Sequence, residues 1–226
     1  EENIQKLNKA KITIVGLGGI GCPLTQYLVS SGIKNLTFFD GDLIEKSNLA
    51  RQILYSLEDV GKFKTLVAKE KVLKTNPNCN ITAYSKHLIK DNLTLLLKSD
   101  IIIDATDDWH TSKLINKYCL KNSLKYIFSS AINHNIQICL FDNMKNHVCL
   151  NCLFPNKEEV DLPRCETVGI SSICAGIAGL VTAQKTINTL LNTKDETNIL
   201  TLVDTSDLSI SNITIKNNIN CELNNS

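Results

Sequence analysis

The chain has 226 residues, enough for one sizeable α/β domain and marginal for two. Its 24 Lys and Arg residues against 23 Asp and Glu give a net charge of +1, which argues against a nucleic-acid-binding protein. No apolar run approaches the roughly 18 to 20 residues of a membrane-spanning helix. The charged stretch at 1–11 is no secretory signal, so we expect a cytoplasmic protein whose nine cysteines are mostly buried free thiols.

Strand-like and helix-like patterns alternate through the first half of the chain. In chain order they predict a strand at 12–15, a helix at 23–31, a strand at 35–40, a helix at 63–74, a strand at 81–85, a short helix at 93–97, a strand at 100–105, a helix at 111–121, and strands at 126–131 and 136–141. This order is typical of a Rossmann-like, doubly wound, mostly parallel sheet.

The second half of the chain has a different pattern. A loop-like excursion at 143–163 precedes a long helix of small residues at 170–191, and strands at 200–203 and 208–215 end the chain as an antiparallel continuation of the sheet. We treat 1–226 as a single domain, with a nucleotide-binding half at about 10–132 and a cysteine-containing half at about 133–226.

A glycine-rich turn lies between the first strand and the first helix. Gly16, Gly18 and Gly21 form a G-x-G-x-x-G pattern, in which glycine permits a tight turn, close approach to phosphate, and close helix packing. Asp40 ends the second strand 19 residues later, where a carboxylate can accept hydrogen bonds from a ribose. The pattern favours a nucleotide site, and not a glycine-rich turn that serves only packing. It does not distinguish NAD from ATP.

The segment after Asp40 favours ATP. It brings a second acid, Asp42, and then the polar residues Asn48, Arg51, Gln52 and Lys64. Hydride transfer needs no pair of fixed cations, whereas cleavage of a triphosphate develops negative charge that Arg and Lys stabilise. Either cation alone would be read as a solvated surface charge; together with the glycines they predict a triphosphate site.

Two acids follow the strand at 100–105. Parallel strands present their carboxyl ends to the ligand in such folds, and Asp107 can there hold the Mg²⁺ that accompanies ATP. The alternative is that Asp107 caps the next helix.

With these motifs the chain resembles the ThiF/MoeB-type adenylyltransferases, bacterial relatives of ubiquitin-activating enzymes. The resemblance rests on VGLGGIG (15–21), DGDLIEKSNLARQ (40–52), VGKFK (60–64), DATDD (104–108) and NHVCLNC (146–152), and covers essentially the whole chain. It implies an enzyme that uses ATP and Mg²⁺ to adenylate the C-terminal glycine of a small ubiquitin-like sulfur carrier, ThiS-like or MoaD-like, for thiamine or molybdopterin synthesis. Such relatives are typically homodimers.

The resemblance also implies a role for each motif residue. Asp40 would hold the ribose, with Asp42 beside it, and Asp107 would ligate Mg²⁺. The glycines that would wrap the phosphates are Gly16, Gly18, Gly19 and Gly21, and the residues that would surround the triphosphate are Asn48, Arg51, Gln52 and Lys64.

The cysteines depart from the family pattern. Relatives bind a structural Zn²⁺ with two C-x-x-C pairs; here Cys149 and Cys152 form the first, but the second has only Cys221, with Asn224 in place of its partner. A three-thiolate zinc site completed by Asn224 or water and a decayed site both stay open. Cys165 matches the cysteine that in many relatives forms a thioester or persulfide with the carrier; a structural or vestigial cysteine is the alternative.

Three other functions compete with carrier adenylation. One is an NAD-dependent oxidoreductase built on the same glycine turn. A second is adenylation of a short peptide in antibiotic maturation, although the peptide-clamping domain usual in that branch is not seen in this sequence. A third is a non-catalytic partner subunit, which the presence of Arg51, Lys64 and Asp107 argues against. Relatives also carry an N-terminal arginine that reaches the partner subunit's site, and none is visible before residue 12.

Overall fold

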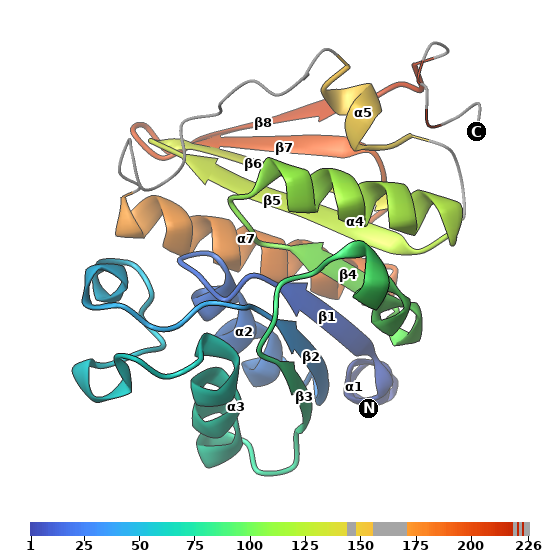
Figure 1. Ribbon diagram of the computed structural model, residues 1–226. Coiled ribbons are helices and arrows are strands. Elements are labelled where there is room, and N and C mark those ends of the chain that lie inside the picture. The colour runs from blue at the N-terminus through green and yellow to red at the C-terminus, as the bar shows by residue number, and fades with distance from the viewer. Residues whose placement is uncertain (144–147, 156–170, 219–220, 222, 224–226) are drawn as a thin grey trace.

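A single mixed β-sheet forms the centre of the molecule. In a computed structural model that describes residues 1–143, 148–155, 171–218, 221 and 223, eight strands pair in the order β3-β2-β1-β4-β5-β6-β7-β8 (Figure 1). The strands are β1 (Lys11–Val15), β2 (Asn35–Phe39), β3 (Asn80–Tyr84), β4 (Ile101–Asp104), β5 (Lys125–Ile132), β6 (Asn135–Asp142), β7 (Ile199–Asp204) and β8 (Ser209–Thr214). Pairing from β3 to β5 is parallel, and from β5 to β8 it is antiparallel.

Helices cover both faces of this sheet. The α-helices are α1 (Glu2–Lys9), α2 (Gly21–Ser30), α3 (Lys64–Thr75), α4 (Trp109–Lys121), α5 (Leu150–Leu153) and α7 (Ser172–Leu191), and the 3₁₀ helices are η1 (Lys46–Ala50), η2 (Leu57–Asp59) and η3 (Lys90–Lys98). One core cluster lies under α1, α2, α3 and α7, and a second lies under η3, α4 and α5.

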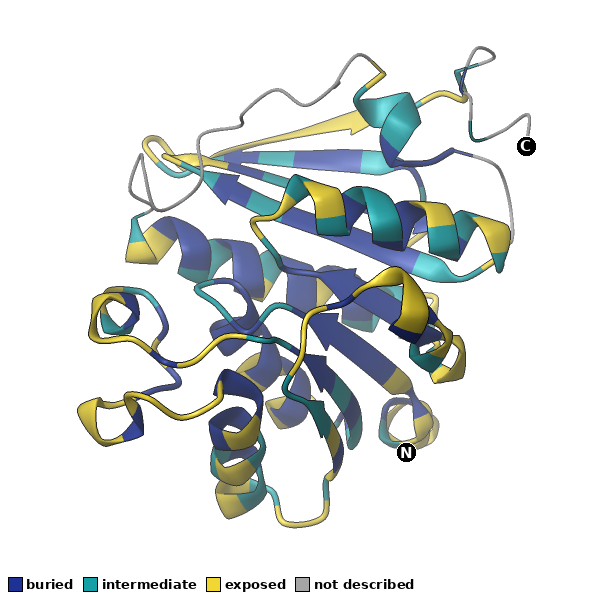
Figure 2. Ribbon diagram, viewed as in Figure 1, coloured by how far each residue is buried: buried dark blue, intermediate teal, exposed yellow. Residues whose placement is uncertain are grey.

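The central strands are buried on both faces, as a parallel sheet between helices requires. In β4, Ile101 and Ile103 belong to one core cluster and Ile102 to the other, and none of the three is exposed to solvent. Figure 2 shows this burial along the central strands and its loss at the edge strand β8, whose six residues are all exposed. Continuous apolar runs such as 101–103 therefore identify the central strands, while β8 marks the open edge.

These elements confirm the predicted fold class, and the strands lie where the sequence places them. The structure adds α1, whose only large apolar residues are Ile4 and Leu7, the short 3₁₀ helices η1 and η2, and α5, which lies inside the expected excursion. The predicted short helix at 93–97 is the end of the longer η3, and the long small-residue helix is α7 from Ser172, residue 170 being outside the described residues. No helix in the described ranges is both long and apolar enough to cross a membrane.

Close packing of α7 against α2 fixes the start of α2. A Cβ on Gly179 would come within 2.7 Å of the Ile20 carbonyl oxygen and 2.6 Å of the Pro23 ring. Only glycine permits that approach. The small residues of α7 therefore hold in place the turn that carries the nucleotide motif.

Candidate functional site

The glycine turn lies at the point where the strand order reverses. β1 pairs with β2 on one side and with β4 on the other, and Val15 stands beside Asp104 at their carboxyl ends. The turn after β1 and the turn after β4 touch, because a Cβ on Gly16 would come within 2.7 Å of the Ala105 carbonyl oxygen. Open α/β sheets bind their ligands in this crevice.

The glycines of the turn serve different purposes. Gly16 has a φ of +91°, a conformation that glycine adopts at little cost. A Cβ on Gly21 would overlap the carbonyl oxygen of Gly16, so this glycine closes the turn on the helix. Gly18 is different, because the nearest atom to its Cβ position is the Gln52 Nε2 at 3.8 Å. Protein packing gives no reason for glycine at 18, which leaves open space above the backbone for a ligand.

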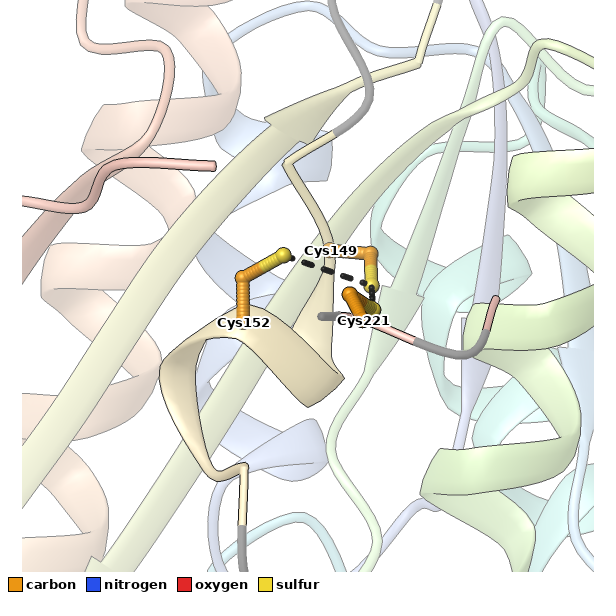
Figure 3. A group of neighbouring side chains, drawn as sticks. All are labelled: Cys149, Cys152 and Cys221. Carbon is orange, nitrogen blue, oxygen red and sulfur yellow. Dashed lines mark hydrogen bonds between the residues drawn. The ribbon is translucent and has the colours of Figure 1, made fainter. Parts of the chain in front are cut away.

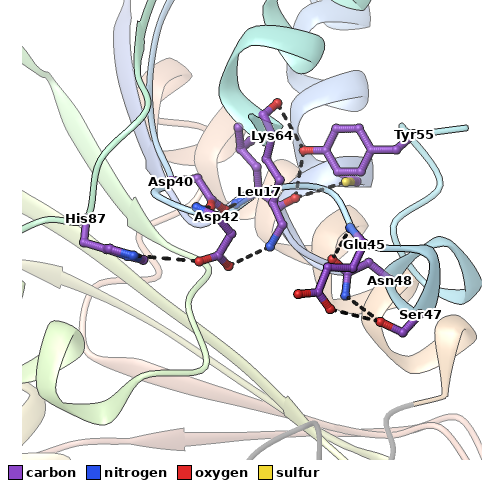
Figure 4. A network of polar contacts seen from close by, with 10 residues as sticks. Leu17, Asp40, Asp42, Glu45, Ser47, Asn48, Tyr55, Lys64 and His87 are labelled. Atoms are coloured by element: carbon purple, nitrogen blue, oxygen red, sulfur yellow. Dashed lines mark hydrogen bonds and ion pairs between the residues drawn. The ribbon is translucent and has the colours of Figure 1, made fainter. Parts of the chain in front are cut away.

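Hydrogen bonds hold the turn in shape at Leu17 (Figure 4). The Leu17 amide donates to Oδ2 of Asp40 at 2.7 Å. The Leu17 carbonyl accepts from the Tyr55 hydroxyl at 3.0 Å and from the Cys22 thiol at 3.4 Å. The sequence analysis assigns ribose binding to Asp40 but no role to Tyr55 or Cys22, because no local pattern links them to the turn. The backbone of the turn is thus fixed by protein contacts alone.

Asp40 connects the turn to the next loop. Its Oδ1 accepts from the Asp42 amide at 2.9 Å. Burial raises the pKa of Asp40, against which the charge of Lys64 and the two amide hydrogen bonds act. Each carboxylate oxygen keeps a lone pair beyond these bonds, so a ribose hydroxyl can still be accepted.

Lys64 and Asp42 form a short ion pair at the start of α3. The ammonium lies 2.8 Å from Oδ2 of Asp42, and the lysine side chain is only 7% exposed while that of Asp42 is 54% exposed. The Lys64 amide also donates to the Asp42 carbonyl at 3.1 Å, so backbone and side chain fix the same pair. The structure thus brings a buried cation beside the acid that follows the ribose carboxylate.

The other predicted triphosphate residues surround η1. Arg51 lies against the turn, because a Cβ on Gly19 would be 3.5 Å from its Cγ, and it makes no ion pair with any described residue. Gln52 is 3% exposed, and its side-chain oxygen has no hydrogen-bond partner within the described ranges. Asn48 is also buried, but its Oδ1 accepts from the Glu45 amide, so that atom caps η1. Arg51 and Gln52 therefore bring unused polar groups to the turn.

The two acids after β4 divide the expected roles. Asp108 is the cap of α4, since its carboxylate accepts from the His110 and Thr111 amides at 3.3 and 3.0 Å. The alternative that Asp107 caps this helix is wrong, because the φ and ψ of Asp108 place it one residue later. Asp107 is exposed and has no hydrogen bond or ion pair with another described residue. It is thereby free to bind a cation.

Three cysteines meet beside α5 (Figure 3). The Cys149 sulfur lies 3.9 Å from that of Cys152 and 3.7 Å from that of Cys221, and all three sulfurs lie within 4.8 Å of one another. Burial raises the pKa of Cys149 to about 12. Burial acts in the same sense on Cys152, but hydrogen bonds from the Asn218 and Cys149 backbone outweigh it and lower its pKa.

The chemistry of this thiol set fits a zinc ion in part. Three sulfurs within tetrahedral reach supply three of the four ligands of a structural site. Asn217 lies beside the cluster, with its Oδ1 3.8 Å from the Cys152 sulfur. Asn224 and Cys165 lie outside the described residues. The eight described cysteines are all free, and most are buried, as expected.

The fold and the site thus define a nucleotide-binding α/β protein with a preformed glycine turn and an adjacent cationic loop. The ThiF family model matches residues 1–223, and the chain belongs to the ThiF family.

Known relatives agree with this assignment. The sulfur carrier protein adenylyltransferase of Thermus thermophilus is 31% identical over 97% of this chain and 84% of its own length. The sulfur carrier protein ThiS adenylyltransferase of Escherichia coli is 30% identical over 88% of this chain and 80% of its own. Among solved structures, Escherichia coli MccB with ATP superposes with a TM-score of 0.83 at 26% identity, covering 98% of this chain and 68% of MccB.

Proposed function

We propose that this chain is an ATP-dependent adenylyltransferase that activates the C-terminal glycine carboxylate of a small ubiquitin-like sulfur carrier, ThiS-like or MoaD-like, with release of pyrophosphate. The observation that carries the proposal is the contact between two turns, the glycine turn after β1 with Arg51 against it and the turn after β4 that leads to Asp107. Open backbone, an unpaired guanidinium and an uncommitted carboxylate there match what ATP and Mg²⁺ require.

The proposed reaction joins two anions. A carrier carboxylate oxygen attacks the α-phosphorus, a new O–P bond forms, and the bond from that phosphorus to the oxygen bridging to the β-phosphate breaks. The acid is already ionised at neutral pH, so no general base is needed. Charge develops on the leaving pyrophosphate, and Arg51 and Lys64 would stabilise it from the side of the turn.

The binding residues divide the nucleotide between them. Asp40 would accept from the ribose, and the backbone at Gly16, Gly18, Gly19 and Gly21 would face the phosphates. Gln52 offers its unpartnered buried oxygen, and Asn48 would act mainly by holding η1. Magnesium bound with the nucleotide would neutralise phosphate charge, and Asp107, exposed and without a partner among the described residues, would ligate it.

The test is exchange of labelled pyrophosphate into ATP, dependent on a carrier that ends in Gly-Gly. We expect exchange with the intact carrier and none with a carrier that lacks its last two residues. An oxidoreductase would instead bind NAD and give no exchange, so either result overturns one of the two readings.

A second candidate substrate is a short peptide. Its support is the structural match to MccB, which has been solved with AMPCPP and MccA, at a TM-score of 0.82 and 25% identity. The same exchange assay with a peptide in place of the carrier distinguishes the two substrates. The greater sequence identity to sulfur carrier adenylyltransferases favours the carrier.

The half at about 133–226 would then hold the carrier and a zinc ion. Cys149, Cys152 and Cys221 supply the thiolates, with Asn217, Asn224 or water as a fourth ligand. The Cys165 thiolate would attack the acyl-adenylate to form a thioester with release of AMP, or, once a persulfide donor has loaded it with a second sulfur, would form the acyl persulfide link with release of AMP. We further propose a homodimer and a cytoplasmic location, which the reduced thiols of the described residues suit.

A further inference from the structure

The glycine next to the ribose carboxylate leaves room for one particular side chain. Gly41 has none of the positive φ values that demand glycine. A Cβ added there would lie 2.6 Å from both Cδ2 and Nε2 of His87, and the three nearest heavy atoms all belong to that imidazole. The space that a side chain at 41 would fill is thus taken by the ring of His87.

That ring faces the acid that holds Lys64. His87 follows β3, and its Nε2 lies 3.8 Å from Oδ1 of Asp42. The other oxygen of Asp42 makes the 2.8 Å contact with the Lys64 ammonium. Figure 4 shows the imidazole and the ammonium on opposite sides of one carboxylate. The His87 imidazole, the Asp42 carboxylate and the Lys64 ammonium thus lie in a row, and Lys64 stands at the end of the row where the nucleotide is expected.

This arrangement bears on the repulsion between Asp42 and a triphosphate that approaches Lys64. The ammonium is buried against Asp42, and a triphosphate that shares it must approach the negative charge of that carboxylate. A polar N–H near the far oxygen offsets part of the carboxylate charge on the side away from the phosphates, and His87 Nε2 lies 3.8 Å from that oxygen with its side chain 73% exposed. His87 is the side chain placed to do this.

We propose that His87 is a positioning residue that holds Asp42 from the side opposite Lys64, so that the buried ammonium can be shared with the nucleotide phosphates. The inference rests on the proposed function, since it assigns His87 to the same ATP site. Gly41 belongs to the same arrangement, because the His87 ring occupies the space that a Cβ at position 41 would fill.

Two variants that act on the ring by different routes test this. His87→Ala removes the imidazole, and Gly41→Ala displaces it without changing any polar group. Each should weaken ATP binding, measured by titration calorimetry, and raise the KM for ATP in exchange, both about three- to fivefold, with kcat changed less than twofold. The double variant should be no worse than either single one. His134→Ala, an exposed histidine on the β5–β6 turn, is the matched control and should equal the parent.

Replacements of the ring separate the effect of a polar N–H from that of ring bulk. His87→Gln keeps a donor and should recover most of the affinity, whereas His87→Phe keeps only a ring and should not. Normal ATP affinity in His87→Phe, additive losses in the double variant, or unchanged affinity in His87→Ala would each overturn the proposal. A chain that binds ATP without exchange refutes the adenylation proposal, while its ATP affinities still decide the role of His87.

Discussion

The two halves of the sheet carry their chemistry in different ways. Around β1 and β4, polar groups stand at the carboxyl ends of parallel strands, and the contacts that hold them span from 22 residues, for Lys64 and Asp42, to 38 residues, for Tyr55 and Leu17. Beside β6 and β7, the thiol cluster joins Cys149 to Cys221, which lie 72 residues apart. The first site depends on the backbone conformation of turns at the ends of neighbouring strands. The second site forms only when residues far apart in the chain come together. Activity should therefore depend on the parallel half, and stability in the presence of metal on the thiol cluster.

The sharpest test of that division is Arg51→Ala. Loss of a group that stabilises developing charge should lower carrier-dependent pyrophosphate exchange by about 10²–10³-fold, while ATP binding persists through the glycine turn. Lys46→Ala removes an exposed cation of η1 and is the matched control, with exchange within twofold of the parent. Exchange that survives Arg51→Ala would remove this residue from the mechanism.

The glycines offer a way to separate structure from binding within one turn. Gly21→Ala places a Cβ on the Gly16 carbonyl and should lower the free energy of unfolding by about 2–3 kcal/mol, measured by urea denaturation. Gly18→Ala meets no atom of the described residues closer than 3.8 Å, so stability should stay within about 0.5 kcal/mol while the KM for ATP rises. The reverse pattern would mean that the turn does not present Gly18 to a ligand.

The thiol cluster should respond in the opposite manner. Cys149→Ser should reduce zinc from about one ion per chain to near zero by elemental analysis, because a three-sulfur site cannot spare its most central ligand. Thermal stability with zinc present should fall, since bound metal stabilises the folded state. Cys79→Ser, outside the cluster, is the control. A parent chain without zinc would show that the cluster has lost its metal.

The smallest expected effect concerns the helix cap Asp108. Asp108→Ala should cost about 1 kcal/mol of stability, the usual value of a helix cap, and change exchange little. Burial raises the pKa of Asp108, but hydrogen bonds from Thr111 and His110 outweigh it, so its folded pKa is lowered. The cap is therefore fully effective above the unfolded pKa of about 4 and is lost as pH falls through the lower folded value.

The measurement is the difference in unfolding free energy between parent and Asp108→Ala across that pH range. It should be constant at neutral pH and shrink under acid conditions. Asp107→Ala, the matched neighbour, should leave stability unchanged at all pH values and abolish most exchange. If stability falls for Asp107→Ala instead, the assignment of the two acids is reversed.

Prediction from sequence succeeded where a local pattern had one physical cause. The apolar run at 101–103 and the glycine spacing identify a buried strand and a strand–turn–helix, because both depend on neighbours in the chain. The sequence did not identify Asp108 as the cap of α4, because two adjacent acids do not show which of them takes the backbone conformation of a cap, while Asp107 as a magnesium ligand stays a prediction.

Contacts between distant segments account for what the sequence could not predict. The hydroxyl of Tyr55 reaches the turn across 38 residues, and the imidazole of His87 approaches Gly41 from beyond another strand. Helix α1 has few apolar residues and a single buried one, Leu7, so its pattern is too weak to identify. The pairing of Lys64 with Asp42 likewise needs the fold, because 22 residues separate the two side chains.

The bonds that hold Leu17 have a consequence for how fast ATP is captured. The side chains of Asp40, Tyr55 and Cys22 already hold this backbone in place. Ligand binding therefore costs less conformational entropy than it would with a flexible loop. Encounter should then lead to capture without a slow closing step, and the association rate should follow diffusion and ionic strength instead of loop motion.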